Sequence, residues 1–125
     1  EFIGEYEGTY HGYMTLTYGF HSIDDEISGD ETFSITYGEG DYDIIMLIDD
    51  QQVNGTVRGR KATFEDYTLS SEEDSLTSFT TYSMSAKLKK DGSLHYASVI
   101  YGNVIYEHNL FPVEGMIEGL ASKID

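Results

Sequence analysis

The chain has 125 residues, of which 23 are acidic and seven are basic, and its formal net charge of -16 argues against nucleic acid or an anionic lipid surface as a partner. It contains 11 Tyr, 6 Phe and no Cys, so it is too rich in aromatic residues to be disordered, and neither disulfides nor thiolate metal sites support it. Its length suits one domain over residues 1–125 with a single core, and no apolar run approaches the ~18 residues of a transmembrane helix.

Residues 6–18 alternate between two faces over more positions than any other segment of the chain. Period-two alternation of aromatic and β-branched residues is typical of a half-buried strand, and glycines on one face allow a long strand to coil. We therefore predict the first strand of a barrel here. The predicted inward side chains are Tyr10, Met14, Leu16 and Tyr18, and the predicted outward ones are Thr9, Thr15 and Thr17.

The next segments alternate between polar, glycine-containing stretches and short apolar runs. Residues 19–31 predict a long acidic loop, and residues 32–37 predict a second strand. A glycine-rich hairpin turn follows at residues 38–41. The nearly continuous apolar run over residues 42–48 then predicts a third strand that is covered on both faces.

Further strands are expected over residues 52–58, 61–69, 76–88, 94–101 and 104–111. The register of the first of these stays open, because Asn54-Gly55 inside it is itself a strong hairpin signal. Residues 70–74 predict a polar loop, and Gly102-Asn103 predicts another turn.

A short C-terminal helix is expected over residues 113–124. Pro112 has no backbone N–H to donate and should end the sheet. Apolar side chains then recur at helical spacing, at Val113, Met116, Ile117, Leu120 and Ile124. The whole pattern predicts an all-β fold, an antiparallel up-and-down barrel of about eight strands with this helix packed on it.

The string Gly8-Thr9-Tyr10-His11-Gly12 resembles the start of the first strand in lipocalin-like (calycin-like) proteins of gut Bacteroidetes, and Gly8-Thr9-Tyr10 resembles the lipocalin Gly-x-Trp motif with Tyr in place of Trp. Those proteins are mostly exported lipoproteins of unassigned function. The resemblance implies an extracytoplasmic location, whether periplasmic, cell-surface or secreted. A lipocalin also places an Arg after its last strand, over the motif aromatic, and the only cation after Phe111 here is Lys123.

The motifs of catalysis and metal binding are missing from the sequence. The four histidines lack the spacing of a zinc site, and a calcium loop anchored on Asp24, Glu26 and Ser28 would have Ile35 where a bidentate Glu is required. There is no nucleophilic-serine or phosphate-loop motif, and no carboxylate pair is fixed at a catalytic spacing. We expect a non-catalytic domain with no cofactor and no metal site.

Tyr and Met residues on predicted inward faces form the candidate binding site: Tyr10, Met14, Tyr37, Met46, Tyr82, Met84, Tyr96 and Tyr106. A buried Tyr hydroxyl needs a hydrogen-bond partner and Met adapts to varied shapes, so this lining suits a small apolar or aromatic ligand. Alternatively, the same residues fill a small barrel, and the domain is a protein–protein interaction or structural surface module with an exposed apolar patch.

Charge is expected to separate between the two ends of the barrel, because alternate loops of a meander lie at the same end. The loops after the first, third and fifth strands predict an acidic rim that attracts a weakly bound calcium ion or a basic partner: Asp24, Asp25, Glu26, Asp30, Glu31, Asp49, Asp50, Glu72, Glu73 and Asp74. Six of the seven cations are expected at the other end: Arg58, Arg60, Lys61, Lys87, Lys89 and Lys90.

Overall fold

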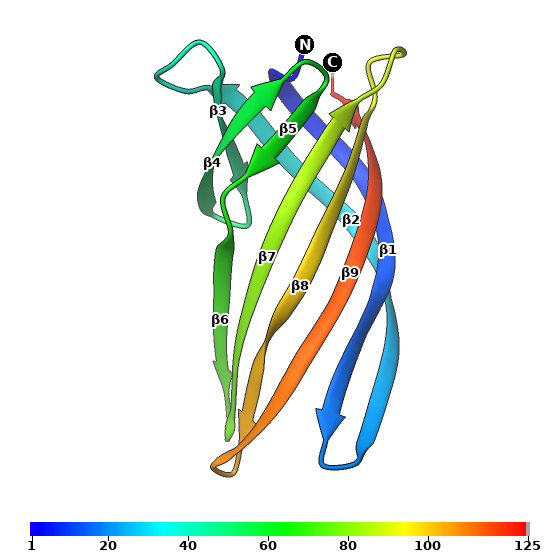
Figure 1. The fold of residues 1–125 in the computed structure, drawn as a ribbon, viewed down its shortest axis with the longest axis vertical. Coiled ribbons are helices and arrows are strands. Elements are labelled where there is room, and N and C mark those ends of the chain that lie inside the picture. Colours follow the sequence, from blue (N-terminus) through cyan, green and yellow to red (C-terminus); the bar gives the residue numbers. More distant parts are fainter. Residues whose placement is uncertain (125) are drawn as a thin grey trace.

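The computed structural model describes residues 1–124, in which the regular elements are nine β-strands (Figure 1). In chain order these are β1 (Gly4–Tyr18), β2 (His21–Tyr37), β3 (Asp43–Ile48), β4 (Gln51–Arg58), β5 (Lys61–Phe64), β6 (Tyr67–Glu73), β7 (Leu76–Leu88), β8 (Leu94–Tyr106) and β9 (Asn109–Lys123). All the pairings are antiparallel, so the all-β antiparallel prediction is confirmed.

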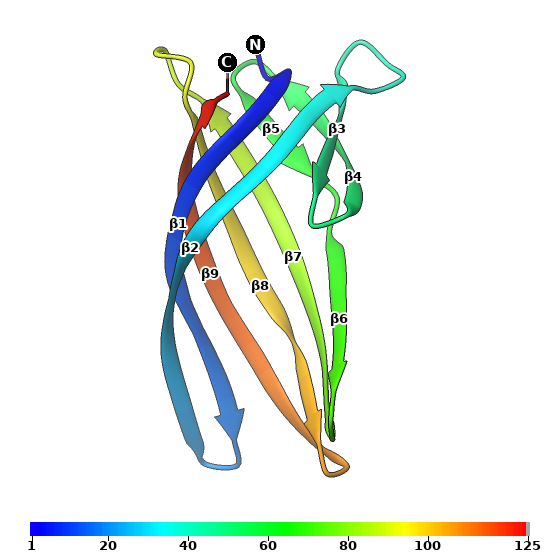
Figure 2. The same cartoon turned by 180° about the vertical axis from the view of Figure 1, so that it is seen from behind.

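The strands form one sheet in the order β5-β4-β3-β2-β1-β9-β8-β7-β6, and an additional pairing of β5 with β7 closes eight of them into a ring (Figures 1 and 2). This seam is short, because only Lys61, Ala62 and Thr63 pair across it. Beyond the seam β7 pairs with β6 instead. We call the end that holds the β4–β5 and β7–β8 turns the closed end, and the end that holds the β1–β2, β6–β7 and β8–β9 turns the open end.

The open end lacks a strand between β2 and β6. Within residues 1–124, β6 pairs only with β7, and residues 21–33 of β2 pair only with β1. Figure 2 shows β2 and β6 as the two borders of this gap, with β7, β8 and β9 behind it. The ring is therefore closed at one end and open along one side at the other.

The hydrophobic core lies at the closed end. Tyr6 stacks on Phe33 with 5.3 Å between ring centroids, and Tyr96 meets the same Phe33 edge-on at 5.6 Å. Met46 and Leu94 are fully buried beside them. Each fully buried side chain of this kind contributes about 1.5 to 3 kcal/mol to folding, so this end anchors the sheet.

The predicted faces of β1 are largely confirmed. Tyr10, Met14 and Leu16 are partly buried on the inner face, and Thr9 and Thr17 are exposed on the outer face. Thr15 is half-buried and donates a hydrogen bond of 2.7 Å to Asp24 Oδ1 on β2. Tyr18 is 57% exposed, because it lies at the open end, where the inner face of the sheet is not covered.

The predicted C-terminal helix is wrong, because residues 113–123 belong to β9. The segment also alternates with period two, with Val113, Gly115, Ile117, Gly119 and Ala121 buried and the residues between them exposed. β9 lies between β8 and β1 and pairs with both. Pro112 does not end the sheet, since at that position β9 pairs only with β8 and a missing N–H is tolerated there.

The acidic loop predicted over residues 19–31 is also wrong. The β1–β2 turn is confined to Gly19 and Phe20, and β2 begins at His21. The turn predicted at Gly102-Asn103 lies inside β8, and the strand predicted over residues 52–58 is confirmed as β4, with Asn54-Gly55 inside it. The β3–β4 turn is made by Asp49 and Asp50, where the sequence also predicts the chain to turn, and their φ angles of 50° and 61° are those of a tight hairpin turn.

The other boundary errors concern the loop predicted over residues 70–74 and the single strand predicted over residues 61–69. Most of the predicted loop belongs to β6, and Glu65 and Asp66 separate β5 from β6. The predicted strand therefore divides into β5, which pairs with both β4 and β7, and β6, which pairs with β7.

Charge separates along the molecule in part as predicted. The six cations lie beside the β4–β5 and β7–β8 turns at the closed end, while Asp24 and Glu73 lie near the turns of the open end (Figure 1). The turn of Asp49 and Asp50 lies only partway down, because β3 and β4 are short. The acidic loop of residues 38–42 lies at the closed end, so the separation is incomplete.

Candidate functional site: a tyrosine-lined cavity under the open side

A cavity of about 360 Å³ lies inside the sheet between β2 and β6, the two strands that border the gap. Its apolar lining is Met14, Ile27, Ile48, Met84, Ile100 and Ile117. Its polar and aromatic lining is Tyr10, Asp30, Glu31, Thr32, Asp49, Tyr67, Tyr82, Tyr96 and Ser98. A cavity of this size, with apolar walls and several polar groups, is suited to a small molecule that has both kinds of surface.

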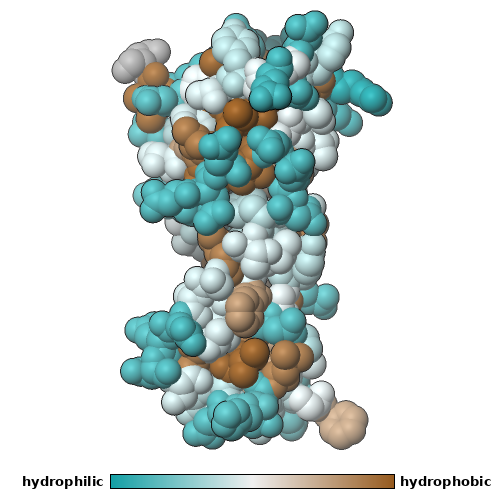
Figure 3. Space-filling model, turned by 90° about the vertical axis from the view of Figure 1, so that its left-hand side faces the viewer, coloured by the Kyte–Doolittle hydropathy of each residue, from teal (hydrophilic) through white to brown (hydrophobic). Residues whose placement is uncertain are grey.

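The molecule also exposes apolar surface near this site. Figure 3 shows hydrophobic side chains reaching the surface in the lower half, bordered by hydrophilic ones. Ile23 on β2 and Leu76 on β7 are 56% and 39% exposed, and both belong to inner faces of the open end. The missing strand leaves these side chains without cover.

Five of the eight predicted site residues line the cavity: Tyr10, Met14, Tyr82, Met84 and Tyr96. The other three lie elsewhere. Met46 is fully buried in the core of the closed end, and Tyr37 and Tyr106 are 71% and 46% exposed. The β3 and β8 ladders carry Met46 and Tyr106 beyond the two ends of the cavity.

Two of the tyrosines are positioned by glycines directly opposite them. Tyr10 pairs with Gly29 on β2, and Tyr96 pairs with Gly119 on β9. A Cβ at Gly119 would lie 2.2 Å from Tyr96 Cζ, and a Cβ at Gly29 would lie 2.8 Å from the Tyr10 hydroxyl oxygen. The rings therefore lie over the glycines, a cross-strand arrangement that stabilises both partners.

Tyr96 holds a polar group without a partner. Its side chain is 1% exposed, and its hydroxyl has no hydrogen-bond partner within residues 1–124. Burial, with smaller effects of Glu31 and Tyr10, raises its pKa to about 12. An unpaired buried hydroxyl costs about 1 to 3 kcal/mol, so a bound molecule that supplied a partner would gain affinity.

The cavity is also lined by Glu31, which the sequence analysis assigned to the acidic rim, and by Tyr67, which it did not single out. Tyr67 on β6 stacks on Tyr82 of β7 with 5.2 Å between ring centroids. Burial raises the pKa of Glu31 to about 7, and the nearby Asp49 carboxylate adds to the shift. Burial is also the main cause of the raised pKa of Tyr67 and Tyr82, and Glu31 and Asp49 add to it in both. The Glu31 carboxyl therefore shares the cavity with the tyrosine hydroxyls.

Metal binding has no geometric support at this site. Within residues 1–124, no group of three or more His, Cys, Asp or Glu side chains is placed to hold a metal ion. The residues of the calcium template, Asp24, Glu26 and Ser28, lie along extended β2 and not in a loop that could wrap an ion.

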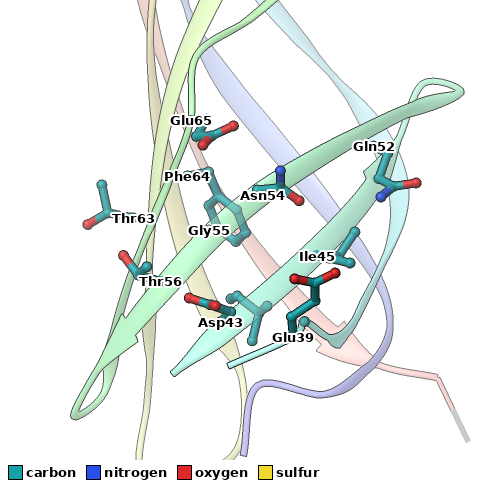
Figure 4. Close-up of a pocket in the computed structure, with 12 residues that line it drawn as sticks. Glu39, Asp43, Ile45, Gln52, Asn54, Gly55, Thr56, Thr63, Phe64 and Glu65 are labelled. Atoms are coloured by element: carbon teal, nitrogen blue, oxygen red, sulfur yellow. The ribbon is translucent and has the colours of Figure 1, made fainter. Parts of the chain in front are cut away.

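A second, larger groove of about 640 Å³ lies over the outer face of β3, β4 and β5. Figure 4 shows the carboxylates of Glu39, Asp43 and Glu65 spread along it, with Phe64 beside Gly55. These three carboxylates are exposed. The groove is a surface feature of the sheet, and we regard the cavity inside the sheet as the better candidate.

The outer face of the sheet carries an apolar row. Tyr13 on β1, Met116 on β9 and Val99 on β8 are cross-strand neighbours and are 47%, 38% and 52% exposed. Exposed apolar side chains that adjoin one another are typical of a surface that contacts another protein.

Lys123, the cation that follows Phe111, lies over the ring of Tyr6 and not over Tyr10, the aromatic residue of the lipocalin-like motif. Lys123 Nζ lies 6.0 Å from the centroid of the Tyr6 ring, and it donates a hydrogen bond of 2.6 Å to the carbonyl of Glu1. Tyr10, the aromatic of the predicted motif, lines the cavity instead.

Within residues 1–124 we find no helix with the length and apolar character needed to span a membrane. No known family matches the sequence, and no curated protein matches it. Among solved structures, the chain is similar to one described as the monomer form of the M. tuberculosis PknI sensor domain, with 12% identity and a TM-score of 0.44 over 94% of this chain and 86% of that chain. The lipocalin-like resemblance stays a prediction.

Proposed function

We propose that this chain is a non-catalytic, extracytoplasmic domain that binds a small amphipathic molecule in the cavity between β2 and β6. The observation that carries the proposal is the unpaired hydroxyl of Tyr96, a fully buried residue that lines a cavity of about 360 Å³ with both polar and apolar walls. Such a hydroxyl is costly in the free protein and becomes favourable when a ligand pairs with it. The extracytoplasmic location rests on the resemblance of Gly8-Thr9-Tyr10-His11-Gly12 to lipocalin-like proteins.

The cavity supplies the two kinds of contact that an amphipathic ligand needs. Met14, Met84 and Ile117 offer adaptable apolar surface for the body of the ligand. Tyr96 and Glu31 offer hydrogen-bonding groups for its polar end. The gap between β2 and β6 gives the ligand a route to the cavity.

The test is a thermal-shift screen of the chain against fatty acids, sterols, bile acids and small aromatic molecules, followed by calorimetry of the compounds that stabilise it. Ile27→Trp should fill the cavity from β2 and abolish binding, because Ile27 lies on the inner side of that strand. Ser28→Trp is the matched control, since its side chain is exposed on the outer face. A screen without a stabilising compound, or equal binding by Ile27→Trp, would contradict the proposal.

A second candidate function is a surface interaction module, and the apolar row of Tyr13, Met116 and Val99 favours it. The partner that is simplest to test is a second copy of the chain. We expect sedimentation velocity to detect concentration-dependent self-association that Met116→Lys removes. A chain that stays monomeric at all concentrations would exclude this form of the module.

A further inference from the structure

We propose that the ligand of this cavity carries a primary or secondary ammonium group next to an apolar or aromatic body, and that Glu31 and the surrounding tyrosines bind the ammonium. This inference rests on the proposed function, because it names the ligand class of the same site.

The charges around the cavity select for a cation. Asp30, Glu31 and Asp49 line it, and within residues 1–124 the lining includes no Lys, Arg or His. Six of the seven cations of the chain lie at the closed end, and the seventh, Lys123, lies over Tyr6. A partly buried carboxylate without a counter-ion is costly, and a positively charged ligand removes that cost.

The aromatic lining suits an ammonium group in particular. Tyr10, Tyr67, Tyr82 and Tyr96 line the same cavity as Glu31, and the Tyr67 and Tyr82 rings are stacked. A cation near the face of a Tyr ring is attracted by its quadrupole, more strongly where water is excluded. A carboxylate beside several tyrosine rings is thus a combined electrostatic and cation–π site.

The buried hydroxyl of Tyr96 further restricts the class of ligand that the cavity can bind. Its oxygen has a free lone pair and no partner within residues 1–124, so it can accept a hydrogen bond from a ligand N–H. Primary and secondary ammonium groups have N–H donors for both Tyr96 and Glu31, whereas a quaternary ammonium has none. A metal ion is a poor alternative, because no group of three ligating side chains is assembled within these residues.

The whole chain favours the arrival of such a ligand. With a net charge of -16, it attracts cations over a distance of about 8 Å at physiological ionic strength. The open side between β2 and β6 exposes Asp25, which pairs with Met14 and shares its inner face. The ammonium group would then reach Glu31, and the apolar body would lie against Met14 and Ile117.

The experiment compares ligands that differ only in charge. Calorimetry of the whole chain at about pH 8 measures the affinity for 2-phenylethylamine against 2-phenylethanol, and for octylamine against octanol. A hydrogen bond to a charged group contributes about 1.5 to 3 kcal/mol, so we expect each amine to bind at least about tenfold more tightly than its alcohol. The preference should fall to near zero in Glu31→Gln and persist in Glu26→Gln, which removes the same charge from the outer face of β2.

Protonation gives a second readout. Near pH 5.5, about 1.5 units below the Glu31 pKa of about 7, the carboxyl is mostly neutral while the amine stays charged, so the preference should shrink. The Asp49 carboxylate adds to the raised pKa of Glu31, and the Glu31 carboxyl adds in turn to the raised pKa of Tyr67, Tyr82 and Tyr96.

The outcomes separate the two proposals. Equal affinity for amine and alcohol in both pairs, or an unchanged preference in Glu31→Gln, overturns the ammonium proposal and leaves the small-molecule function standing. Failure of all four compounds, together with an unproductive ligand screen, overturns both.

Discussion

Two buried tyrosines, Tyr6 and Tyr96, have opposite hydrogen-bonding states. The Tyr6 hydroxyl donates to the carbonyl of Phe2 at 2.8 Å, while the equally buried Tyr96 hydroxyl has no partner within residues 1–124. Both side chains pack on the same Phe33 ring, Tyr6 face to face and Tyr96 edge-on. The difference between them isolates the cost of an unpaired polar group.

We predict that Tyr96→Phe raises the free energy of unfolding by about 1 kcal/mol, whereas Tyr6→Phe lowers it by about 1 kcal/mol. The first change removes an unsatisfied hydroxyl, and the second removes a satisfied one together with its hydrogen bond. Urea unfolding followed by circular dichroism measures both values. A loss of stability in Tyr96→Phe equal to that in Tyr6→Phe would mean that the Tyr96 hydroxyl is paired in solution.

The raised pKa of Glu31 predicts that the stability of the chain depends on pH. Its folded pKa of about 7 lies above the ordinary value of 4.5, so its neutral form is favoured in the folded chain. The stability that this provides is fully present below about pH 4.5 and is lost as the pH rises through about 7.

We therefore expect Glu31→Gln to melt at a higher temperature than the natural chain at about pH 8, and the difference to shrink toward about pH 4.5. Thermal melts of both proteins across this range provide the measurement. Glu26→Gln is the control, because Glu26 is exposed on the same strand. An identical pH profile for Glu31→Gln and the natural chain would show that the carboxyl is solvated.

At the scale of the element, β9 offers a direct test of strand against helix. Gly115 faces inward, and a Cβ there would lie 2.1 Å from the backbone oxygen of Tyr13 and 2.9 Å from Met14 Cα. In a helix over residues 113–124, Gly115→Ala would instead stabilise the chain by about 1 kcal/mol. The sign of the effect therefore distinguishes the two structures.

We predict that Gly115→Ala destabilises the chain by about 1 to 3 kcal/mol, because backbone atoms of β1 must shift to make room. Glu114→Ala, one residue away and exposed, should change stability by less than about 0.5 kcal/mol. Chemical denaturation of both variants gives the comparison, and a stabilised Gly115→Ala would be incompatible with the strand.

Segments with apolar alternation were predictable from sequence, and segments at the open side were not. Residues 76–88 alternate clearly, and the predicted strand matches β7 in both bounds. β2 over residues 21–33 has no strand on its far side, so its sequence is acidic and resembles a loop. Residues 113–124 fit both a helical and a period-two pattern, and only the two neighbouring strands decide between them.

The candidate site was likewise predictable only where its residues belong to strands with clear apolar alternation. Tyr10, Met14 and Tyr96 were predictable because they alternate with outward residues in recognisable strands. Glu31 was not, since its inward direction depends on a strand that its sequence does not reveal. Tyr67 lies within a predicted strand, and its large aromatic side chain was the signal that could have identified it.

At the scale of the whole molecule, the closed end holds the hydrophobic core and the open side gives access to the cavity. The closed end holds the core around Tyr6, Phe33 and Met46, so the sheet does not need a complete ring along its whole length. The open side can then leave the edges of β2 and β6 unpaired and keep the cavity accessible between them.

The seam that closes the ring carries a row of like charges. Arg58 on β4 pairs with Lys61 on β5, and Lys61 pairs in turn with Lys87 on β7. All three are exposed on the outer face, and like charges directly opposite each other on neighbouring strands are destabilising. Since β5 joins β7 through only three residue pairs, this row weakens the closure itself.

We predict that Lys61→Glu increases the free energy of unfolding by about 0.5 to 1 kcal/mol, because it turns two like-charge pairs into opposite-charge pairs. Lys90→Glu is the matched control: it makes the same change in net charge but lies in the β7–β8 turn, outside the row. The difference between the two variants in urea unfolding should shrink in about 1 M NaCl, where screening shortens the reach of surface charges to about 3 Å. If Lys61→Glu is no more stable than Lys90→Glu at low salt, the three side chains do not face one another across the seam, and β5 does not join β7 in this register.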